Sequence, residues 1–203
     1  MAPNPAPKFG VFDDFLSPAL HSGILAYALA NEAKFKPSGI LRSETGEVDT
    51  RLRQSLRCED GLGPFKDAFT AAVHARLPSL FESTGVQPFA VTETELELAA
   101  HGHAGFYKMH LDTFTQVARQ AAQSDRMISA VYYFNRTPKG FSDGDLQLYR
   151  FGGGPADRIE PQDNRLLAFA SFAPHEVLPI DCPSGRFEDY RFAINCWLHR
   201  ARD

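Results

Sequence analysis

The second half of the chain alternates short extended runs with turn residues, and this pattern constrains the fold more than any other feature. From about Thr92, glutamates alternate with less polar side chains over residues 92–98, which is the period of a half-buried strand. Further extended runs occupy residues 105–112, 128–135, 145–151, 166–172, 175–179 and 190–199. Turn residues separate them, and the glycine triplet at 152–154 predicts a hairpin turn. Many short strands in succession predict a two-sheet β-sandwich or barrel.

Helical patterns precede these strands. Ser17-Pro18 is typical of a helix start, with a capping hydroxyl followed by proline at the first helical position, and the pattern continues to about Ala33. A second helix is predicted from about Pro64 toward residue 81, bent or interrupted at Pro78. Between the two helices, residues 35–61 are polar and contain glycines, which predicts a long loop or a weakly structured lid. Helices followed by strands predict a mainly β fold with N-terminal helices packed against it.

The composition is that of one ordinary globular domain. The chain has 203 residues, of which 43% are hydrophobic and 23% charged. We expect a single domain over residues 1–203, with a disordered lead-in at 1–10, helical support and a lid loop at 11–89, and a strand-rich core at 90–203. The net charge of −4 and the pI near 6.0 argue against a dedicated binder of nucleic acid or anionic membranes.

The ends and the cysteines indicate a cytoplasmic protein. The N-terminus lacks the basic and apolar regions of a signal peptide, and no apolar run approaches membrane-spanning length. Cys58, Cys182 and Cys196 are odd in number, widely spaced and without a C-x-x-C pair, so we interpret them as reduced thiols.

One group of residues carries chemistry: His110 and Asp112, with His175 downstream. Two imidazoles and one carboxylate can occupy one face of an octahedral iron(II) ion and leave the opposite face open. Residues two apart on a strand point the same way, so His110 and Asp112 can reach one metal together. His175 is a candidate third ligand, and Arg191 a candidate anchor for a co-substrate. The alternative for the His-x-Asp pair is a surface histidine on an ordinary strand.

Taken together, residues from about 90 to 200 resemble the iron(II)- and 2-oxoglutarate-dependent oxygenases, in the prolyl 4-hydroxylase-like branch. Five segments carry the resemblance in the family's order: residues 105–112 (GFYKMHLD), 126–135 (RMISAVYYFN), 144–148 (GDLQL), 164–169 (NRLLAF), and 175–179 (HEVLP) with the strand 191–197 (RFAINCW). The resemblance implies a double-stranded β-helix, the jelly roll of cupin-like proteins, in agreement with the strand pattern.

The resemblance also implies roles for individual residues. His110, Asp112 and His175 would ligate iron(II), and Arg191 would pair with the distal carboxylate of 2-oxoglutarate, helped by the Tyr133 hydroxyl. A guanidinium suits this task because its planar fork matches a carboxylate.

Other residues are candidates for the same pocket. By strand alternation Asn195 and Trp197 share the face of Arg191 and would line its pocket. His101 stands where many relatives have a tyrosine that faces the co-substrate, and His101 or His103 would supply a hydrogen bond there; the alternative is a solvated loop histidine. Residues 181–189 look inserted, so Arg186 is a rival to Arg191 as the anchor.

The implied activity is hydroxylation of an unactivated C–H bond with release of succinate and CO2. The implied target is a prolyl or other amino-acid residue in a peptide or protein; the alternative is a free amino acid or a natural-product intermediate. The implied cofactors are Fe(II), 2-oxoglutarate as co-substrate and O2, with ascorbate as a possible reductant. We expect a peptide, protein or small-molecule partner, no nucleic acid and no membrane, and the oligomeric state stays open.

Two hypotheses of another class use the same residues. A zinc-binding, non-oxygenase jelly-roll protein could hold its metal with the same triad, and a metal-free binding module would not need it. Arg51, Arg53 and Arg57 in the polar loop either bind an acidic substrate or a peptide carboxylate, or are solvated or paired within the protein.

Overall fold

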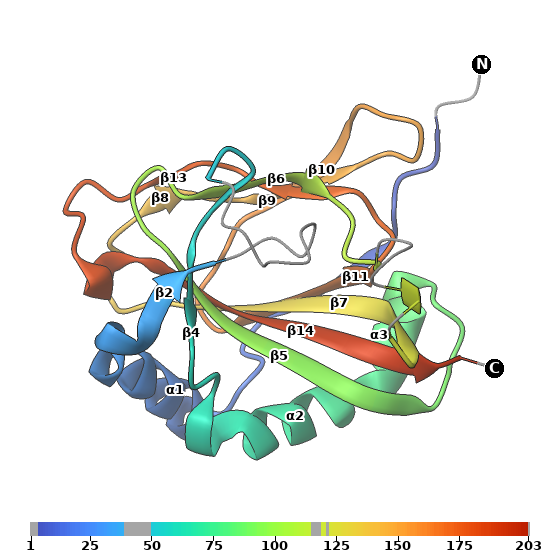
Figure 1. The fold of residues 1–203 in the computed structure, drawn as a ribbon, viewed down its shortest axis with the longest axis horizontal. Coiled ribbons are helices and arrows are strands. Elements are labelled where there is room, and N and C mark those ends of the chain that lie inside the picture. Colours follow the sequence, from blue (N-terminus) through green and yellow to red (C-terminus); the bar gives the residue numbers. More distant parts are fainter. Residues whose placement is uncertain (1–3, 39–49, 115–118, 121, 203) are drawn as a thin grey trace.

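Two facing β-sheets with helices beneath the larger one form the fold (Figure 1). The computed structural model describes residues 4–38, 50–114, 119–120 and 122–202. The larger sheet has the strand order β1-β11-β7-β14-β5-β4-β2, and the smaller sheet has the order β10-β9-β12-β6-β3. The predicted mainly β fold with N-terminal helices is therefore confirmed.

The strands of the larger sheet are β1 (Phe9–Phe12), β2 (Phe35–Pro37), β4 (Leu56–Cys58), β5 (Val91–His101), β7 (Ser124–Phe134), β11 (Arg165–Ala170) and β14 (Arg191–Ala201). The smaller sheet contains β3 (Arg53–Gln54), β6 (Phe106–His110), β9 (Leu146–Tyr149), β10 (Pro155–Ile159) and β12 (His175–Val177). A separate pair joins β8 (Ser142–Asp143) to β13 (Ile180–Asp181). The helices are α1 (Pro18–Ala30), α2 (Lys66–His74) and α3 (Leu77–Thr84), with 3-10 turns η1 (Glu32–Lys34), η2 (Gly63–Phe65) and η3 (Phe187–Asp189).

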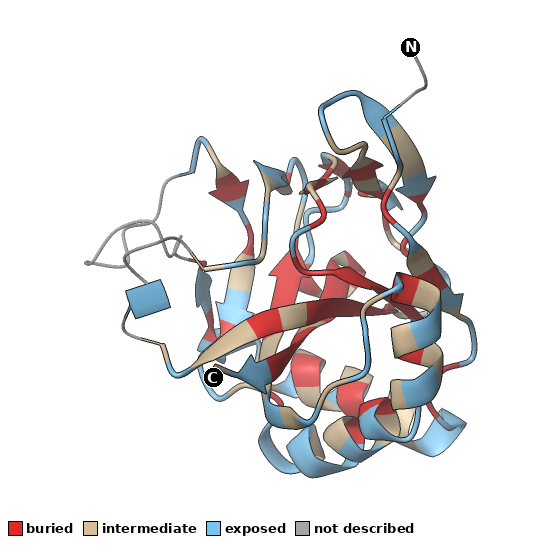
Figure 2. Cartoon of the chain, turned by 90° about the vertical axis from the view of Figure 1, so that its right-hand side faces the viewer, coloured by how far each residue is buried: buried red, intermediate tan, exposed pale blue. Residues whose placement is uncertain are grey.

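Strand alternation divides the larger sheet into two faces. On β14, Ile194 and Cys196 belong to the core that the sheet shares with the helices. Ala193, on the same strand, packs instead with Leu148 of the smaller sheet. Figure 2 shows the buried sides of the helices turned toward the sheet. The odd-numbered residues from Arg191 to Trp197 therefore face the space between the two sheets.

The helices begin and end close to the predicted positions. The Ser17 hydroxyl accepts a hydrogen bond from the backbone of Leu20, with Pro18 in the first turn of α1. This helix ends at Ala30, earlier than predicted, because η1 follows it directly. The second predicted helix is divided into α2 and α3, and Pro78 lies in the first turn of α3, where no helical N–H is needed. None of the described helices is long and apolar enough to span a membrane.

The predicted disordered lead-in at residues 1–10 is wrong at its C-terminal end. Phe9 and Gly10 belong to β1, which pairs with β11. A side chain at Gly10 would lie 2.3 Å from the Ser83 hydroxyl, so glycine allows this strand to lie close to α3. Upstream, the Pro5 carbonyl accepts a hydrogen bond from the backbone of Phe151. Edge pairing orders the described part of this segment.

The expected long loop at residues 35–61 contains three short strands. Here β2 and β4 extend the larger sheet, whereas β3 pairs with β6 in the smaller one. Residues 39–49 of the proposed lid lie outside the described residues. The hairpin turn predicted at 152–154 is confirmed, because β9 and β10 pair around three glycines of positive φ.

Candidate active site

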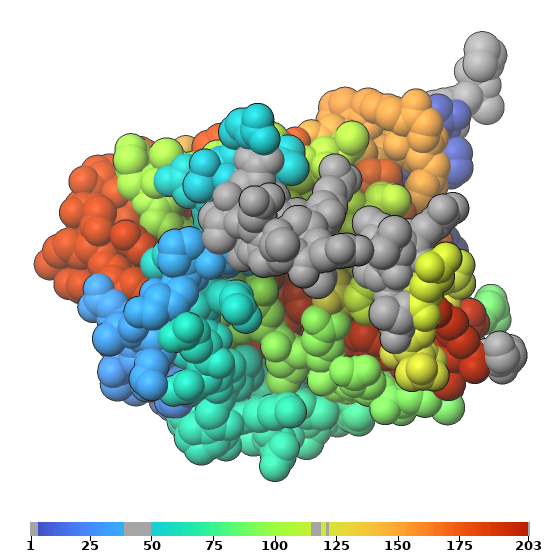
Figure 3. All heavy atoms as spheres, in the orientation of Figure 1, coloured from blue at the N-terminus to red at the C-terminus, as the bar shows by residue number. Residues whose placement is uncertain are grey.

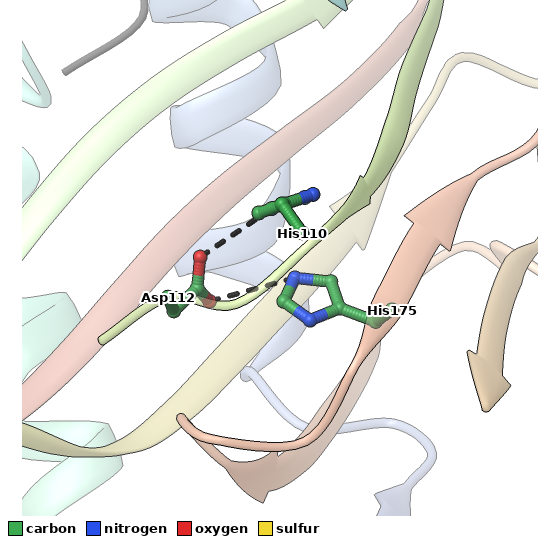
Figure 4. Close-up of side chains that lie close together, drawn as sticks. All are labelled: His110, Asp112 and His175. Atoms are coloured by element: carbon green, nitrogen blue, oxygen red, sulfur yellow. Dashed lines mark ion pairs between the residues drawn. The ribbon is translucent and has the colours of Figure 1, made fainter. Parts of the chain in front are cut away.

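The side chains of His110, Asp112 and His175 converge between the two sheets (Figure 4). His110 ends β6 and His175 begins β12, and the two are direct partners across the strand pair. Asp112 lies beyond the end of β6, where its backbone N–H donates to the carbonyl of Ser171. One ligand atom from each of the three residues lies within 4.8 Å of the others. The Asp112 carboxylate oxygens are 3.5 Å from His110 Nε2 and 3.6 Å from His175 Nε2.

Both imidazoles are oriented by the backbone. His110 Nδ1 lies 2.8 Å from the carbonyl oxygen of Lys108, and His175 Nδ1 lies 2.9 Å from that of Ala173. A carbonyl can only accept, so Nδ1 carries the proton in each ring. In the neutral form of each ring the lone pair then lies on Nε2, the atom nearest the carboxylate, where it can bind a metal.

The electrostatics of His175 and Asp112 favour the protonation states that metal binding requires. Burial, with a contribution from His110, lowers the pKa of His175 to about 4, so this ring is neutral at pH 7. Burial opposes ionisation of Asp112, but His175, His110 and the Ser129 hydroxyl together hold its pKa far below the ordinary value. Ser129 Oγ donates to Asp112 Oδ2 at 2.6 Å. Two imidazoles and one carboxylate suit a divalent transition metal, including iron(II).

A β-bulge in β6 places a tyrosine against the first histidine. The partners of His175 and Val177 on β6 are His110 and Tyr107, so the four residues 107–110 of β6 oppose the three residues 175–177 of β12. Without the extra residue, Tyr107 and His110 would point to opposite faces. Their rings instead stack, with centroids 3.5 Å apart and planes 16° apart.

Deeper in the same space lies a guanidinium with unused donors. Arg191 is 1% exposed, and its Nε and Nη2 have no hydrogen-bond partner among the described residues. Its Nη1 lies 3.4 Å from His101 Nδ1, which must therefore accept, leaving the ring proton on Nε2. Within the part of the chain that the structure describes, that Nε2 and the Tyr133 hydroxyl are also buried without a partner that meets hydrogen-bond geometry. The Tyr133 ring lies 4.8 Å from the guanidinium carbon.

These four unpaired groups can all donate, and leaving them buried without a partner is costly. An anion with several acceptor oxygens would satisfy them, and the Nε–Nη2 edge of Arg191 matches a carboxylate in bidentate fashion. The residues present therefore fit the distal carboxylate of 2-oxoglutarate.

The other sequence-predicted residues lie elsewhere. The Arg186 side chain is 57% exposed and pairs with the exposed Glu188 and the buried Asp189. His103 is 60% exposed and pairs with Asp181. Neither residue lies with the four buried donors.

Asn195 and Trp197 share the face of Arg191, as alternation predicts, but have other partners. Asn195 donates to Glu97 at 3.0 Å, and the Trp197 ring lies 4.0 Å from the guanidinium carbon of Arg126. Trp197 is the strand partner of Ser129, which contacts Asp112, so it lies toward the triad. A co-substrate role for Asn195 and Trp197 stays a prediction.

Two arginine–glutamate pairs lie on the wall of this space. Arg126 forms a bidentate pair with Glu95, and Arg53 pairs with Glu97. Sequence reasoning missed the first pair, and for Arg53 it left internal pairing open as an alternative. The alternating glutamates of β5 could have indicated these ion pairs, because Glu95 and Glu97 face inward and a buried carboxylate needs a cationic partner. Arg53 also lines a cavity of about 470 Å³ beside the β5–β6 turn. Figure 3 shows the cyan residues just after position 50 lying against green residues of that turn.

Comparison with known proteins decides the family. Residues 96–199, just over half of the chain, match the model of the 2OG-Fe(II) oxygenase superfamily. The chain belongs to this superfamily. The predicted family and the predicted double-stranded β-helix are thereby confirmed. The oxygenase family implies iron(II), 2-oxoglutarate and O2 as cofactors, in agreement with the triad and with the donors around Arg191.

Relatives of this oxygenase include hydroxylases. This chain and an uncharacterized PKHD-type hydroxylase from Synechocystis sp. are 30% identical over 201 residues. The match covers 95% of this chain and 63% of that protein. The fold of this chain matches a Pseudomonas putida prolyl-4-hydroxylase with a TM-score of 0.68 and 23% identity, over 96% of this chain and 94% of the other. A Trichoplax adhaerens prolyl hydroxylase, solved with a hypoxia inducible factor peptide fragment, matches with a TM-score of 0.68 and 20% identity, over 95% and 83% of the two chains.

Proposed function

We propose that this oxygenase hydroxylates an unactivated C–H bond of a prolyl or other amino-acid residue in a peptide or protein, using iron(II), 2-oxoglutarate and O2. One observation carries the proposal: a His-Asp-His triad and a buried guanidinium with two unpaired donors occupy the same space between the sheets. A zinc-binding jelly roll would use the triad, but zinc binding alone would not supply an acceptor for these buried donors.

In this proposal one set of residues binds the metal and another set binds the co-substrate. His110, Asp112 and His175 would hold iron(II) on one face, leaving the other open. When bound, iron(II) and 2-oxoglutarate activate O2 for hydroxylation of the substrate, with release of succinate and CO2. Arg191, His101 and Tyr133 would orient the co-substrate by donating to its distal carboxylate.

Apolar side chains isolate these contacts from water. Val131 and Phe169 of the larger sheet and Leu148 of the smaller one are buried in the same layer as Tyr133. Ionic contacts strengthen when water is excluded, so the apolar wall would increase the contribution of Arg191.

A peptide or protein substrate is the proposal that the relatives favour. The matched structures include prolyl hydroxylases, and the Trichoplax adhaerens protein was solved with a peptide. Two polar segments are candidates for contacts with the substrate, residues 35–61 and 113–125, and each lies only partly within the described chain. A free amino acid or natural-product intermediate is the alternative substrate. Ascorbate as reductant and a cytoplasmic location complete the proposal.

Anaerobic titration of metal-free protein tests the chemistry. Iron(II) is added first and 2-oxoglutarate second, while the visible absorption of the iron–keto-acid pair is followed. We expect the band in the wild type, its loss in His110→Ala, and a requirement for much more 2-oxoglutarate in Arg191→Ala. Absence of the band from folded wild-type protein would contradict the proposed oxygenase chemistry and favour the zinc or binding-module hypotheses.

Succinate release tests the substrate class. Proline-containing peptides, free proline and other free amino acids are compared at equal concentration in the presence of iron(II), 2-oxoglutarate and ascorbate. Turnover stimulated by peptides alone supports the peptide proposal, whereas stimulation by a free amino acid alone contradicts it.

A further inference from the structure

An ion pair crosses the space between the two sheets beside the triad. Arg53 of β3 donates from Nη2 to Glu97 Oε1 of β5 at 2.5 Å, and from Nε to the Ser55 hydroxyl at 2.7 Å. Asn195 donates to the same Glu97 oxygen at 3.0 Å. The Arg53 side chain is 9% exposed. Two side-chain partners and a shielded setting hold this guanidinium in one position.

The guanidinium of Arg53 in turn lies over an aromatic ring. Its central carbon is 5.0 Å from the ring centroid of Tyr107, the residue that the β6 bulge turns inward. Arg53 and Tyr107 are also strand partners, so backbone pairing and the cation–π contact act together. Tyr107 then stacks on His110 at 3.5 Å between centroids. The contacts run without a gap from Glu97 through Arg53 and Tyr107 to His110.

The two histidines of the triad differ in their need for such support. His175 is 4% exposed and lies between the rings of Phe169, at 4.7 Å, and His110, at 4.2 Å. His110 ends its strand, and Tyr107 and His175 are the rings that contact it. Its hydrogen bond to Lys108 fixes which nitrogen carries the proton but still permits the ring to tilt. The Tyr107 ring restricts that tilt.

We propose that Arg53, held by Glu97, is a positioning residue that fixes the imidazole of His110 through Tyr107. The inference rests on the proposed function, because it takes His110 as a metal ligand. This role explains why the buried Arg53–Glu97 ion pair is present, since well-packed apolar side chains at the same positions would stabilise the fold as much. It also links β3 to the metal-binding strand β6, since the two strands pair and Lys108 donates its backbone N–H to Leu52, just before β3.

Metal affinity measured in the folded protein tests the inference. Cobalt(II) and iron(II) binding are measured by competition with a chelator, and the visible spectrum of the cobalt(II) form is recorded. For Arg53→Met we expect affinity about 10 to 100 times weaker, the usual effect of removing an outer partner of a ligand, and an altered cobalt(II) spectrum. Glu97→Gln should cause a smaller loss. The double variant should lose no more than Arg53→Met, because both residues act through one contact.

Control variants separate positioning from general stability. Arg186→Met removes a surface arginine that also pairs with carboxylates, and it should leave affinity and spectrum unchanged. A merely structural role for Arg53 would lower the unfolding temperature of the metal-free protein without changing the affinity of the folded form. If Arg53→Met does not fold, Tyr107→Leu replaces it, with Tyr107→Phe, which keeps the stacked ring, as the expected rescue.

The outcomes are distinguishable. Wild-type affinity and spectrum in folded Arg53→Met, or in Tyr107→Leu if the former does not fold, would overturn the inference and leave the proposed function intact. If His110→Ala binds metal as tightly as the wild type, His110 is no ligand, and both the inference and the proposed function fail.

Discussion

Arg191 and His101 face each other across neighbouring strands, with Nη1 and Nδ1 3.4 Å apart. Both side chains are buried. Burial and the charges of Arg191 and Arg53 hold the pKa of His101 well below 6.5, so the imidazole is neutral and accepts from the guanidinium. His101 Nε2 and the Nε and Nη2 atoms of Arg191 therefore remain available as hydrogen-bond donors. A group of buried donors of this kind favours the binding of an anion.

The fork of Arg191 matters as much as its charge. Replacing Arg191 with Met should weaken 2-oxoglutarate binding at least about 30-fold, since truncating one partner of a buried, hydrogen-bonded charge pair costs roughly 2–5 kcal/mol. Arg191→Lys keeps the charge but not the fork, so it should restore only part of the affinity. Calorimetric titration with the metal bound measures both. Arg186→Met, at the rival position, should bind as the wild type does; a large loss there would reverse the assignment.

The buried neutral histidine makes stability depend on pH. The unfolded chain protonates His101 near its ordinary pKa of about 6.5, whereas the folded chain does not until much lower pH. Below about pH 6.5 the unfolded state therefore binds more protons, and the free energy of unfolding falls as the pH falls. Urea unfolding between pH 8 and pH 5 should show a shallower decline for His101→Asn than for the wild type. A residual slope is expected from His175, whose pKa is also lowered. Equal slopes would contradict the prediction.

Ser129 orients the carboxylate of the triad. Its hydroxyl donates to Asp112 at 2.6 Å and contacts the Ser171 hydroxyl at 3.0 Å. We expect Ser129→Ala to weaken iron(II) binding by about 10- to 100-fold with little change in the fold. Ser171→Ala is the matched control, because Ser171 makes no side-chain contact with Asp112 among the described interactions, and its effect should be smaller. Equal effects of both variants would refute a specific role for Ser129.

The helices and the strand-rich core should unfold together. Phe69 of α2 is fully buried, with its ring 6.4 Å from Phe15 and 5.6 Å from Tyr132 of β7. Phe69→Ala should lower the free energy of unfolding by about 3–5 kcal/mol, through lost burial and the cavity left behind. Val11→Ala, at a more exposed position, should change it far less. Calorimetry should show one transition shifted to lower temperature; two separate transitions would argue against the single domain expected for residues 1–203.

The sequence predicts those parts of the site that depend on strand period alone. The long runs at 124–134 and 191–201 keep their alternation in the structure, so Tyr133 and Arg191 lie on the inward face as expected. His110 and Asp112 also reach one centre, although β6 ends between them.

Other parts of the site depend on contacts that leave no local pattern. The β6 bulge is visible only in its pairing with β12, and β3 has two residues, too few to show a period. Arg53 and Glu97 are 44 positions apart, and neither residue shows in the sequence that it pairs with the other. The expected lead-in at 1–10 failed for a similar reason, because its edge pairing with β11 is a tertiary effect.

The acceptors that set the protonated nitrogen of His110 and His175 are main-chain carbonyls, each two residues upstream of its histidine. Substitution of a side chain leaves the main-chain carbonyl in place, so these two hydrogen bonds can persist while the amino-acid sequence changes. Insertions and deletions are the events that they do not tolerate. One residue gained or lost between Lys108 and His110, or between Ala173 and His175, would break the spacing while every ligand survived in the sequence. Lineages of this protein should accordingly vary in side chains around the centre and keep these two short intervals constant in length.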